Sequence, residues 1–525
     1  MSRIHLVFVV LAGCLAAVAI FGCSLSSGNP RTIYVTATPN GQSISTAIGS
    51  PVPDMPDVIP TGDPLRVVSF ETRPQEHMVI AGDTLTSIAN RYSLTLNSIL
   101  IANPSIDPNL LSIGQKILLP PLPQSTTPNI KIIPDILFVR GPGSESFDIR
   151  AYISTIPGYI RLYTDEVPIR IDNGSEILVT LDGASIIERV AQNYSIDPRL
   201  LLALIEYRSK WLSRSQIAEA AVNDPLSLPQ ALGETSRDGL YSQLTWAANQ
   251  LNQAYYGWKT GGLLSLELLD SGTYTIAATL NAATVAIQVF WGQILGELEW
   301  HQAISRNGFY RTYYTLFGNP FANEFEHIPP NLSQPRLLLP FASDEIWYFT
   351  GGAHGGWGSG SAWAALDFAP PDDPPPGESC YTSRFWVRAV APGIIARSDE
   401  GAVVLDLDND GFETTGWTIL YLHLASEKRV DVGTTVAAGD PLGHAACAGG
   451  FSTATHLHIA RRFNGEWIDA DCHQCSPHHP NPIFVMNGWE TVGIPGQEYQ
   501  GFLARGDERR IAEQGRSISD NRIAG

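Results

Sequence analysis

Charged residues are scarce in this sequence of 525 residues, and basic ones are the scarcer kind. Asp, Glu, Lys and Arg contribute 16%, and the formal net charge is −19, whereas about a quarter of an average globular chain is charged. Nucleic acid and anionic surfaces repel such a chain, which excludes both as main partners. The balance favours a neutral target, such as a glycan or a peptide. The length excludes a single hydrophobic core and predicts roughly two to four domains.

The most prominent apolar run lies at the start of the chain. Arg3 precedes the run Leu6–Phe21, which ends in small residues and Cys23. A short basic start followed by an apolar core is typical of a secretory signal. Its ending resembles a bacterial lipoprotein box, which implies that residues 1–23 are a signal peptide, that Cys23 is acylated and that the chain is anchored to the cell membrane. An uncleaved membrane anchor is the alternative. Either interpretation places the rest of the chain outside the cytoplasm.

Cysteine is sparse, and four of the six residues lie in the last third of the chain. Outside the cell these four are disulfide candidates, and the sequence leaves their three pairings open. They are Cys380, Cys447, Cys472 and Cys475. The last two are also spaced like a structural zinc knuckle, but an oxidising compartment favours disulfides.

Breaks rich in Ser, Thr, Pro and Gly divide the chain. Residues 24–75 have this composition and no periodicity, which predicts a flexible linker. A Pro-rich break closes a compact unit at 76–121. A mainly helical pattern follows at 130–340, then short strands with turns at 345–490 and a tail at 491–525. We therefore expect a multidomain α+β protein.

The unit at 76–121 predicts a strand, two helices and a second strand. Met78–Ile80 and Lys116–Leu119 are the expected strands, and Asp83 or Thr84 is placed to cap the first helix. The order, with its Gly-Asp-Thr-Leu, Asn-Pro and Gly-Gln-Lys-Ile motifs, resembles a LysM module. The resemblance implies a βααβ fold that binds N-acetylglucosamine-containing glycan through two loops. The candidate glycan-binding residues are Gly82, Asp83, Thr84, Asn103 and Pro104. Gly82 and Asp83 could equally serve only as turn and cap.

The middle region, 130–340, predicts a helical domain. Asp197-Pro198 is a helix-start signal, and the stretches Leu240–Tyr256 and Asn281–Leu295 have helical periodicity. The segment after Tyr194 faintly resembles the lysozyme-like lytic transglycosylase fold. Arg208 stands where that fold has its acid, and Arg cannot donate a proton near neutral pH. Glu206 lies two positions earlier and would point elsewhere. We therefore expect a non-catalytic domain, and glycan cleavage through Glu206 is the weakest alternative.

The strongest chemical signal is a His-x-His pair, His456 and His458. In a strand, residues two apart face the same way, so one imidazole can bind a metal while the other lies beside the open position. Asp367 lies in an apolar strand, where an unpaired carboxylate is costly. His354 follows a Gly-rich stretch, and His423 ends the strand Tyr-Leu-His-Leu.

These segments, in this order, resemble the lysostaphin and LytM-type zinc metallopeptidases over residues 345–490. The matching pieces are a His followed by Asp-Phe-Ala, a Val-x-Ala-x-Ala-Pro-Gly turn, Tyr-x-His-Leu, Gly-Asp-x-x-Gly and His-Leu-His. The resemblance implies an antiparallel β domain that holds Zn²⁺ through His354, Asp367 and His458. It also implies that His456 and His423 are catalytic. Thirteen positions separate His354 from Asp367, more than in many relatives, and the intervening Gly/Ser-rich insertion can loop out.

The chemistry expected of this set follows from its composition. Two imidazoles and one carboxylate leave zinc an open position for water, whose pKa falls to about 7. The chain has no His-Glu-x-x-His motif, so a histidine must act as the base, and His456 is the candidate. His423 would stabilise the oxyanion or orient the water. We expect a zinc endopeptidase that hydrolyses the peptide cross-links of peptidoglycan. The alternative is a non-enzymatic wall-binding or hydrolase-activating protein.

One acidic motif has two interpretations. Asp406-x-Asp408-x-Asp410-Gly411 looks like the opening of a calcium loop, but Trp417 stands where such a loop needs a bidentate Glu. A hairpin turn is the better prediction.

Overall fold

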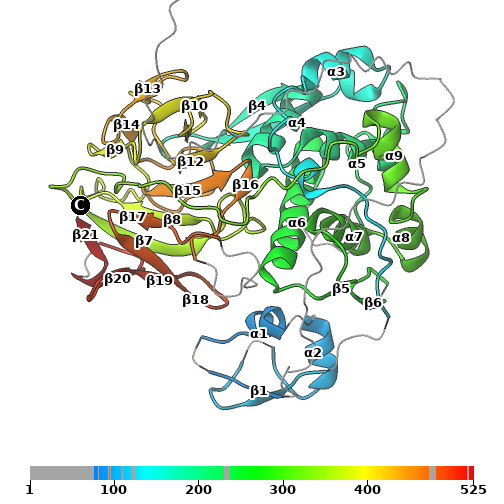
Figure 1. Cartoon of the computed structure of the whole chain (residues 1–525), viewed down its shortest axis with the longest axis horizontal. Helices are drawn as coiled ribbons and strands as arrows, with labels where there is room; N and C mark the ends of the chain where they lie inside the picture. The colour runs from blue at the N-terminus through cyan, green and yellow to red at the C-terminus, as the bar shows by residue number, and fades with distance from the viewer. Residues whose placement is uncertain are drawn as a thin grey trace, which may run out of the picture. The chain divides into compact units, whose positions relative to one another are not determined.

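The computed structural model describes residues 76–80, 82–92, 94, 96–108, 110–120, 125–229, 237–270, 272–471, 481–516 and 519–524. The predicted signal peptide with Cys23, the linker 24–75, and Cys472 and Cys475 lie outside these ranges. Within them, no helix combines the length and the apolar character needed to cross a membrane. Figure 1 shows the helices and strands in chain order.

The N-terminal unit has the predicted strand–helix–helix–strand order. Its elements are β1 (Glu76–Met78), α1 (Leu85–Tyr92), α2 (Leu96–Ala102) and β2 (Lys116–Leu118). The two strands pair antiparallel. The first strand begins two residues earlier than predicted, because Glu76 already pairs with Leu118. The buried His77 side chain in this strand bonds to Asp83 and Tyr92. Of the two candidate caps it is Thr84 that caps α1, since its Oγ1 accepts a hydrogen bond from the Ser87 amide at 3.0 Å.

The middle region is mainly helical, as predicted. Its main elements are α3 (Ile149–Thr155), β3 (Thr164–Arg170), β4 (Glu176–Asp182), α4 (Gly183–Tyr194), α5 (Pro198–Ser209), α6 (Leu240–Thr260), β5 (Ser265–Glu267), β6 (Thr273–Thr275), α7 (Ala282–Ile294), α8 (Glu297–Ala303) and α9 (Phe309–Phe317). Short 3₁₀ turns lie at Asp135–Leu137, Tyr159–Arg161 and Glu219–Ala221. The Asp197 carboxylate caps α5 by accepting from the Arg199 amide, and Pro198 occupies the first turn.

The C-terminal region is built on a nine-stranded sheet, in the part of the chain that is described. Neighbouring strands follow the order β13-β10-β11-β12-β15-β8-β7-β21, and β16 pairs with β15. Their bounds are β7 (Ile346–His354), β8 (Ala365–Ala369), β10 (Gly393–Asp399), β11 (Ala402–Asp406), β12 (Trp417–Leu422), β13 (Thr435–Val436), β15 (Leu457–Phe463), β16 (Glu466–Trp467) and β21 (Arg522–Ala524). All of these pairs are antiparallel, which agrees with the predicted β domain. Two short strands, β9 (Trp386–Arg388) and β14 (Pro441–His444), pair beside it.

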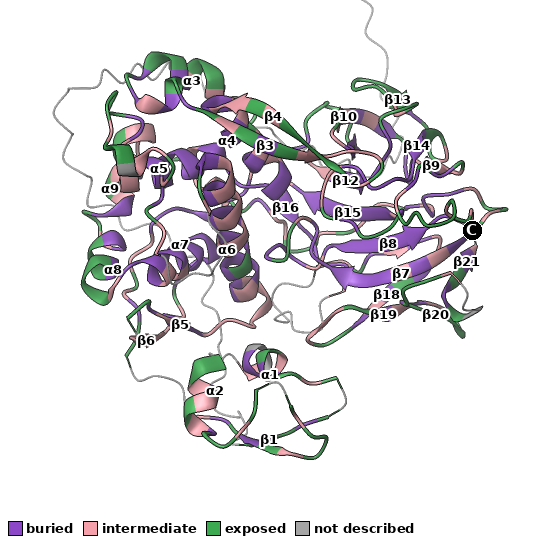
Figure 2. Cartoon of the chain, turned by 180° about the vertical axis from the view of Figure 1, so that it is seen from behind, coloured by how far each residue is buried: buried purple, intermediate pink, exposed green. Residues whose placement is uncertain are grey.

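Both faces of this sheet are covered, and Figure 2 shows its central strands β7, β8 and β15 as largely buried. On one face, Leu366, Val403 and Ile459 belong to a core within the C-terminal region. On the other face, side chains of the sheet join the core of the middle domain; these are Ala365, Val404, Leu420, Ala460 and Trp467. Burial on both faces explains the continuous apolar runs in β11 and β12.

A buried ionic cluster reinforces the contact between the middle domain and the sheet. The Glu466 carboxylate lies 2.6 Å from the Lys259 Nζ and 2.8 Å from the His327 Nε2. The Tyr255 hydroxyl also donates to it, at 2.9 Å. Burial raises the pKa of Glu466, but Lys259 and His327 outweigh this and lower it to about 2.

The predicted tail at 491–525 was wrong, because these residues form strands. β17 (Val485–Met486), β18 (Trp489–Ile494), β19 (Gln497–Arg505) and β20 (Glu508–Ile511) make a four-stranded sheet. After the 3₁₀ turn Ser519–Asn521, β21 returns to the large sheet beside β7. Apolar side chains such as Leu503 and Ile523 are buried, and their burial offsets the conformational entropy lost when the segment is ordered. The domain around the candidate site therefore continues beyond residue 490.

Two local features that the sequence left open are defined in the structure. Cys380 and Cys447 form a disulfide, with Cα atoms 5.6 Å apart. β11 and β12 form the predicted hairpin, and Asp406, the last residue of β11, accepts from the amides of Asp408 and Gly411 in the loop. Burial and the neighbouring carboxylates raise the pKa of Asp408 in this loop to about 7.

Candidate metal centre

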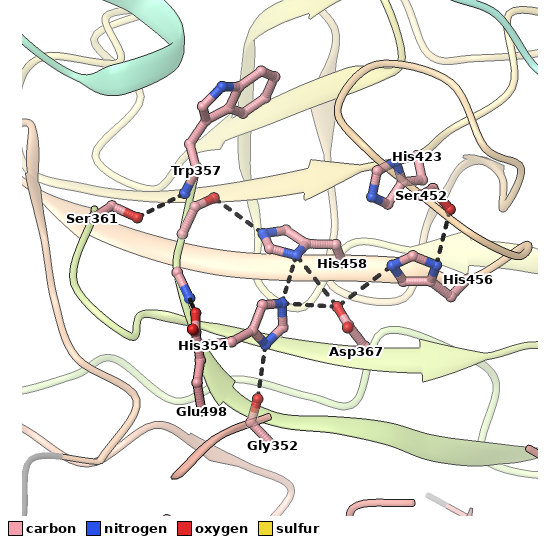
Figure 3. A network of polar contacts seen from close by, with 12 residues as sticks. Gly352, His354, Trp357, Ser361, Asp367, His423, Ser452, His456, His458 and Glu498 are labelled. Carbon is pink, nitrogen blue, oxygen red and sulfur yellow. Dashed lines mark hydrogen bonds and ion pairs between the residues drawn. The ribbon is translucent and has the colours of Figure 1, made fainter. Parts of the chain in front are cut away.

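Three of the predicted side chains converge on one point above the sheet (Figure 3). The His354 Nε2 lies 3.0 Å from the His458 Nδ1. The Asp367 Oδ1 lies 3.2 Å from the first nitrogen and 3.3 Å from the second. All three residues are buried. Three ligands about 2.0–2.1 Å from a tetrahedral zinc ion would lie about 3.3–3.4 Å from one another. The observed triangle is therefore close to the size that zinc requires.

Strand register explains how His458 meets Asp367. β15 lies between β12 and β8, and His458 stands directly opposite Asp367 on β8. On its other side, His458 stands opposite Leu422, the residue before His423. Cross-strand neighbours on one face lie about 4.5–5.5 Å apart at Cβ. The sheet thus brings together side chains that are about ninety positions apart in sequence.

A β-bulge places His354 on the same face. Gly351 pairs with Asp367, but His354 pairs with Ala365, so β7 has one residue more than β8 between these pairs. Without that extra residue, the two-residue period would turn His354 to the opposite face. The glycines here have a steric role as well. A Cβ on Gly351 would lie 2.5 Å from the Asp367 Oδ2, and one on Gly352 would lie 2.4 Å from the Gln500 carbonyl oxygen.

Backbone carbonyls fix which nitrogen of each ring faces the centre. The His354 Nδ1 donates to the Gly352 carbonyl at 2.8 Å, and the His458 Nε2 donates to the Gly356 carbonyl at 3.0 Å. The other nitrogen of each neutral ring then directs a lone pair towards Asp367. The buried Asp367 Oδ1 lies within 3.3 Å of both ring nitrogens but accepts no hydrogen bond of good geometry from the described residues. Two lone pairs and a carboxylate oxygen facing one another call for a cation between them, so these residues fit a metal ion.

The electrostatics of the three residues agree with this demand for positive charge. Burial lowers the pKa of His354, but the Asp367 carboxylate outweighs it and the net shift is upward. Burial lowers the pKa of His458, and the adjacent His354 adds to that decrease. Burial opposes ionisation of Asp367, yet His354 and His456 hold the pKa of Asp367 well below its ordinary value. The site therefore keeps an ionised carboxylate.

The two other predicted histidines lie beside this triangle. The His456 Nε2 is 3.6 Å from the Asp367 Oδ1, and its Nδ1 donates to the Ala454 carbonyl at 2.8 Å. The ring of His423 lies 4.6 Å from that of His456, centroid to centroid. His423 is buried, whereas the His456 side chain is 18% exposed. Of the five residues, His456 is thus the one most open to a substrate.

His423 is held in an unusual backbone conformation. Its φ of 68° lies in the left-handed region, which costs a non-glycine residue of order 1 kcal/mol or more. Its Nδ1 donates to the Ala448 carbonyl at 2.9 Å. Burial lowers the pKa of His423 well below its ordinary value, and the neighbouring His456 and His458 lower it further. In the neutral ring that this lowered pKa favours, a proton on Nδ1 leaves Nε2 as a hydrogen-bond acceptor.

Sequence reasoning missed Tyr499 because it lies in the segment taken for a tail. Its ring stacks on that of His354, with centroids 4.3 Å apart and planes 22° apart. Tyr499 has a φ of 66°, which is rare for an aromatic residue. The adjacent Glu498 accepts a hydrogen bond from the Gly355 amide at 3.1 Å. The apolar pair Phe502–Leu503, between Gly501 and Gly506, was the sequence signal for a strand here.

The candidate glycan-binding residues have identifiable roles within their own module. The Asp83 carboxylate accepts from the Ile80 amide and bonds to the His77 Nε2. The Asn103 side chain bonds to the backbone of Ile99 and Leu118. Gly82 has a φ of 89°, Thr84 is a helix cap and Pro104 is exposed. These contacts shape the two loops, and direct contact with a sugar remains a prediction.

Glu206 in the middle domain has a structural environment. Its carboxylate accepts from the Ser213 hydroxyl at 2.7 Å and from the amides of Leu212 and Ser213. It is buried and closes the turn that follows α5. Arg208 donates to the carbonyls of Leu226 and Ser227. These bonds agree with the prediction that Glu206 is not a catalytic acid.

Comparison with known families assigns each folded region. Residues 77–120 match the LysM domain, 131–331 match the family described as LasA, N-terminal domain, and 381–470 match peptidase family M23. The M23 match includes His423, His456 and His458 and begins after His354 and Asp367.

Individual proteins show the same similarities. Protease LasA from two strains of Pseudomonas aeruginosa is 24% and 25% identical over 376 residues, which is 66% of this chain and 77% of the relative. The secreted LysM effector ECP6 of Passalora fulva is 29% identical over 123 residues, covering 22% of this chain and 50% of that protein. Among solved structures, the M23 metalloprotease pseudoalterin is 22% identical, with a TM-score of 0.26, covering 34% of this chain and 96% of that one. The lysostaphin catalytic domain from Staphylococcus simulans is 28% identical, with a TM-score of 0.16, covering 23% and 80%.

Proposed function

Because the chain carries a LysM domain and an M23 peptidase domain, we propose that it is a zinc-dependent endopeptidase that hydrolyses the peptide cross-links of peptidoglycan. The observation that carries this proposal is the buried triangle of the His354 Nε2, the His458 Nδ1 and the Asp367 Oδ1. It has the donor types and the spacing of a catalytic zinc site, which needs three protein ligands and one open position.

In this proposal His354, Asp367 and His458 hold the zinc ion. When bound, zinc lowers the pKa of a water molecule and polarises the scissile carbonyl. His456 would accept a proton from the attacking water at Nε2, since its Nδ1 donates to the Ala454 carbonyl and its side chain is partly exposed. It then delivers the proton to the leaving amine.

His423 has a narrower role than the sequence suggested. Its Nδ1 hydrogen bonds to the Ala448 carbonyl, and its lowered pKa keeps the ring neutral. A neutral ring with this tautomer cannot donate from Nε2 to an oxyanion. We therefore assign His423 to orienting the attacking water, the second of its two predicted roles.

In this proposal the LysM domain targets the enzyme to the cell wall, by binding N-acetylglucosamine-containing glycan strands close to the peptides that are cut. The protein then acts outside the cytoplasm, and acylation at Cys23 would tether it to the cell membrane. The three ligand candidates and both catalytic histidines are present together, which counts against a non-enzymatic wall-binding protein.

The proposal is tested by measuring zinc content and peptidoglycan cleavage in the same samples. Wild-type protein should hold about one zinc ion per chain and release peptides with newly formed ends, detected by mass spectrometry. Chelation should abolish cleavage, and added zinc should restore it. His458→Ala should lose both metal and activity.

His444→Ala is the matched control, because this buried histidine contacts Trp386 and the Phe385 carbonyl and lies outside the triangle. It should retain zinc and activity. Full zinc occupancy in His458→Ala would refute the ligand assignment, and zinc-loaded wild type that releases no peptides would refute the proposed activity.

A further inference from the structure

The middle domain packs on the face of the sheet that carries the metal centre. Ala365 and Ala460, two positions from Asp367 and His458 on their strands, point into the core of that domain. From the same domain, the β3–β4 hairpin extends to a loop of the peptidase domain, residues 445–452. The Cys447 amide donates to the Asp172 carbonyl, and the Gly449 amide donates to the Arg170 carbonyl, both at 3.0 Å.

These two bonds flank the residue that orients His423. Ala448 lies between Cys447 and Gly449, and its carbonyl accepts the hydrogen bond from the His423 Nδ1. Ala448 has no large side chain to fix its position, and two glycines follow it in the sequence. The hairpin therefore supplies the backbone contacts on either side of this carbonyl. A strained residue such as His423 persists only where its surroundings hold it in place.

Side chains at the hairpin tip make further contacts, one to Ser426 just after His423 and others to the 445–452 loop. The Asp172 carboxylate accepts from the Ser426 amide at 3.0 Å and from its hydroxyl at 2.7 Å. The Arg170 guanidinium donates to the Ser452 carbonyl at 2.9 Å and lies 5.0 Å from the centre of the Phe451 ring. Ser452 in turn lies next to the His456 Nδ1, with its Oγ 3.4 Å away.

Gly174 shows how closely the tip fits. Its φ is 79°, and an added Cβ would lie 2.8 Å from the Cys380 Sγ of the disulfide. The hairpin nevertheless leaves the site open, since Phe451 is 79% exposed and the His456 side chain 18%. The contacts thus support the loop without covering the histidine expected to meet the substrate.

We propose that the β3–β4 hairpin of the middle domain is a positioning element for the catalytic histidines, with Arg170 and Asp172 as its positioning residues. This inference rests on the proposed function. It assigns the middle domain a part in catalysis, although that domain contributes no group to the reaction itself. The hairpin keeps the Ala448 carbonyl and the Ser452 segment in place, and these keep His423 and His456 aligned with the metal centre.

The test compares the double variant Arg170→Ala/Asp172→Ala with wild type in the full chain. We expect kcat to fall roughly 10- to 100-fold, the loss typical of a small misalignment, with little change in KM. Zinc content should be unchanged, because neither residue contacts a ligand. The conservative pair Arg170→Lys/Asp172→Asn should recover much of kcat, since each keeps one of the lost hydrogen bonds.

The matched control is Glu166→Gln. Glu166 lies on the same hairpin, and its carboxylate accepts a hydrogen bond from the Thr180 hydroxyl at 2.7 Å, away from the peptidase loop. It should leave kcat and zinc content at wild-type values. Thermal melting of all variants separates a fold defect from misalignment. In metal-free, ¹⁵N-histidine-labelled protein, the Nδ1 proton of His423 should exchange faster in the double variant.

Each outcome bears on a definite claim. An active wild type with an equally active double variant refutes the inference alone. A double variant that is more active than wild type also refutes it, because the hairpin would then obstruct the site. A folded, zinc-loaded wild type that cleaves no peptidoglycan refutes the proposed function, and the inference falls with it. A loss of kcat that follows a lowered melting temperature, with no change in the His423 signal, shows a structural role only and refutes the positioning role.

Discussion

Gly351 offers a direct test of how the backbone of β7 shapes the metal centre. A methyl group at this position would lie 2.5 Å from the Asp367 Oδ2 and 3.0 Å from its Cβ and Cγ. Ordinary van der Waals contact begins at 3.4 Å, so the carboxylate must move by about 0.9 Å or more. That displacement is a large fraction of a metal–ligand bond, which is about 2.0–2.2 Å long. Gly351→Ala should therefore weaken zinc binding while keeping all three ligands.

The expected loss is of the size seen when the support of a metal ligand is removed, roughly 10- to 100-fold in affinity. This corresponds to about 1.4–2.7 kcal/mol. The assay is competition for zinc against a chelator of known affinity, with melting temperatures measured with and without metal. Gly443→Ala is the matched control, because a Cβ there has its nearest neighbour at 3.6 Å and fits without displacement. Unchanged zinc affinity in Gly351→Ala would show that the bulge does not control the position of Asp367.

Three further predictions follow from the structure. His456→Ala and His423→Ala should each keep zinc while turnover falls on the order of 10²–10⁴-fold, and loss of zinc in either variant would make that residue a ligand. Glu466→Gln leaves Lys259 buried without its partner, so urea unfolding at pH 7 should show a loss of about 3–5 kcal/mol. Because the folded-state pKa of Glu466 is about 2 and the ordinary value is 4.5, its contribution is complete above pH 4.5 and declines towards pH 2; an equal loss at pH 2.5 would contradict this. Recombinant 76–121 should bind insoluble chitin by itself. Failure to sediment with chitin at moderate salt would refute glycan binding by the LysM domain.

Local sequence patterns predicted the elements and residue groups that depend on neighbours in the chain. The helix expected at Asn281–Leu295 is α7, Ala282–Ile294, and the start expected at Asp197-Pro198 is that of α5. Caps and apolar stripes are set within a few positions, so they can be recognised without the fold. The predicted ligand candidates also converge in the structure. Asp367 and His458 lie in β8 and β15, whose short apolar segments indicate strands without knowledge of the fold.

Features that depend on distant contacts were not predictable. The bulge that turns His354 towards Asp367 is defined by the pairing of β7 with β8, across the Gly/Ser-rich insertion. The pairing of Cys380 with Cys447 required the same three-dimensional information. The strands after residue 490 carry charged residues such as Glu508 and Arg509, which obscured their alternation. For that reason the stacking of Tyr499 on His354 could not be anticipated.

The core that the middle domain shares with the sheet limits how this protein can be recombined. Val404, Leu420 and Trp467 belong to the peptidase region by sequence but are buried in the core of its neighbour. A fragment that begins at residue 345 would expose these apolar side chains to water. The free-energy cost is about 25 cal/mol for each Å² of newly exposed apolar surface. Such a fragment would tend to self-associate. Fusions that join this peptidase region to another binding module should therefore include residues 130–340. The two regions then form one unit that can be exchanged between proteins.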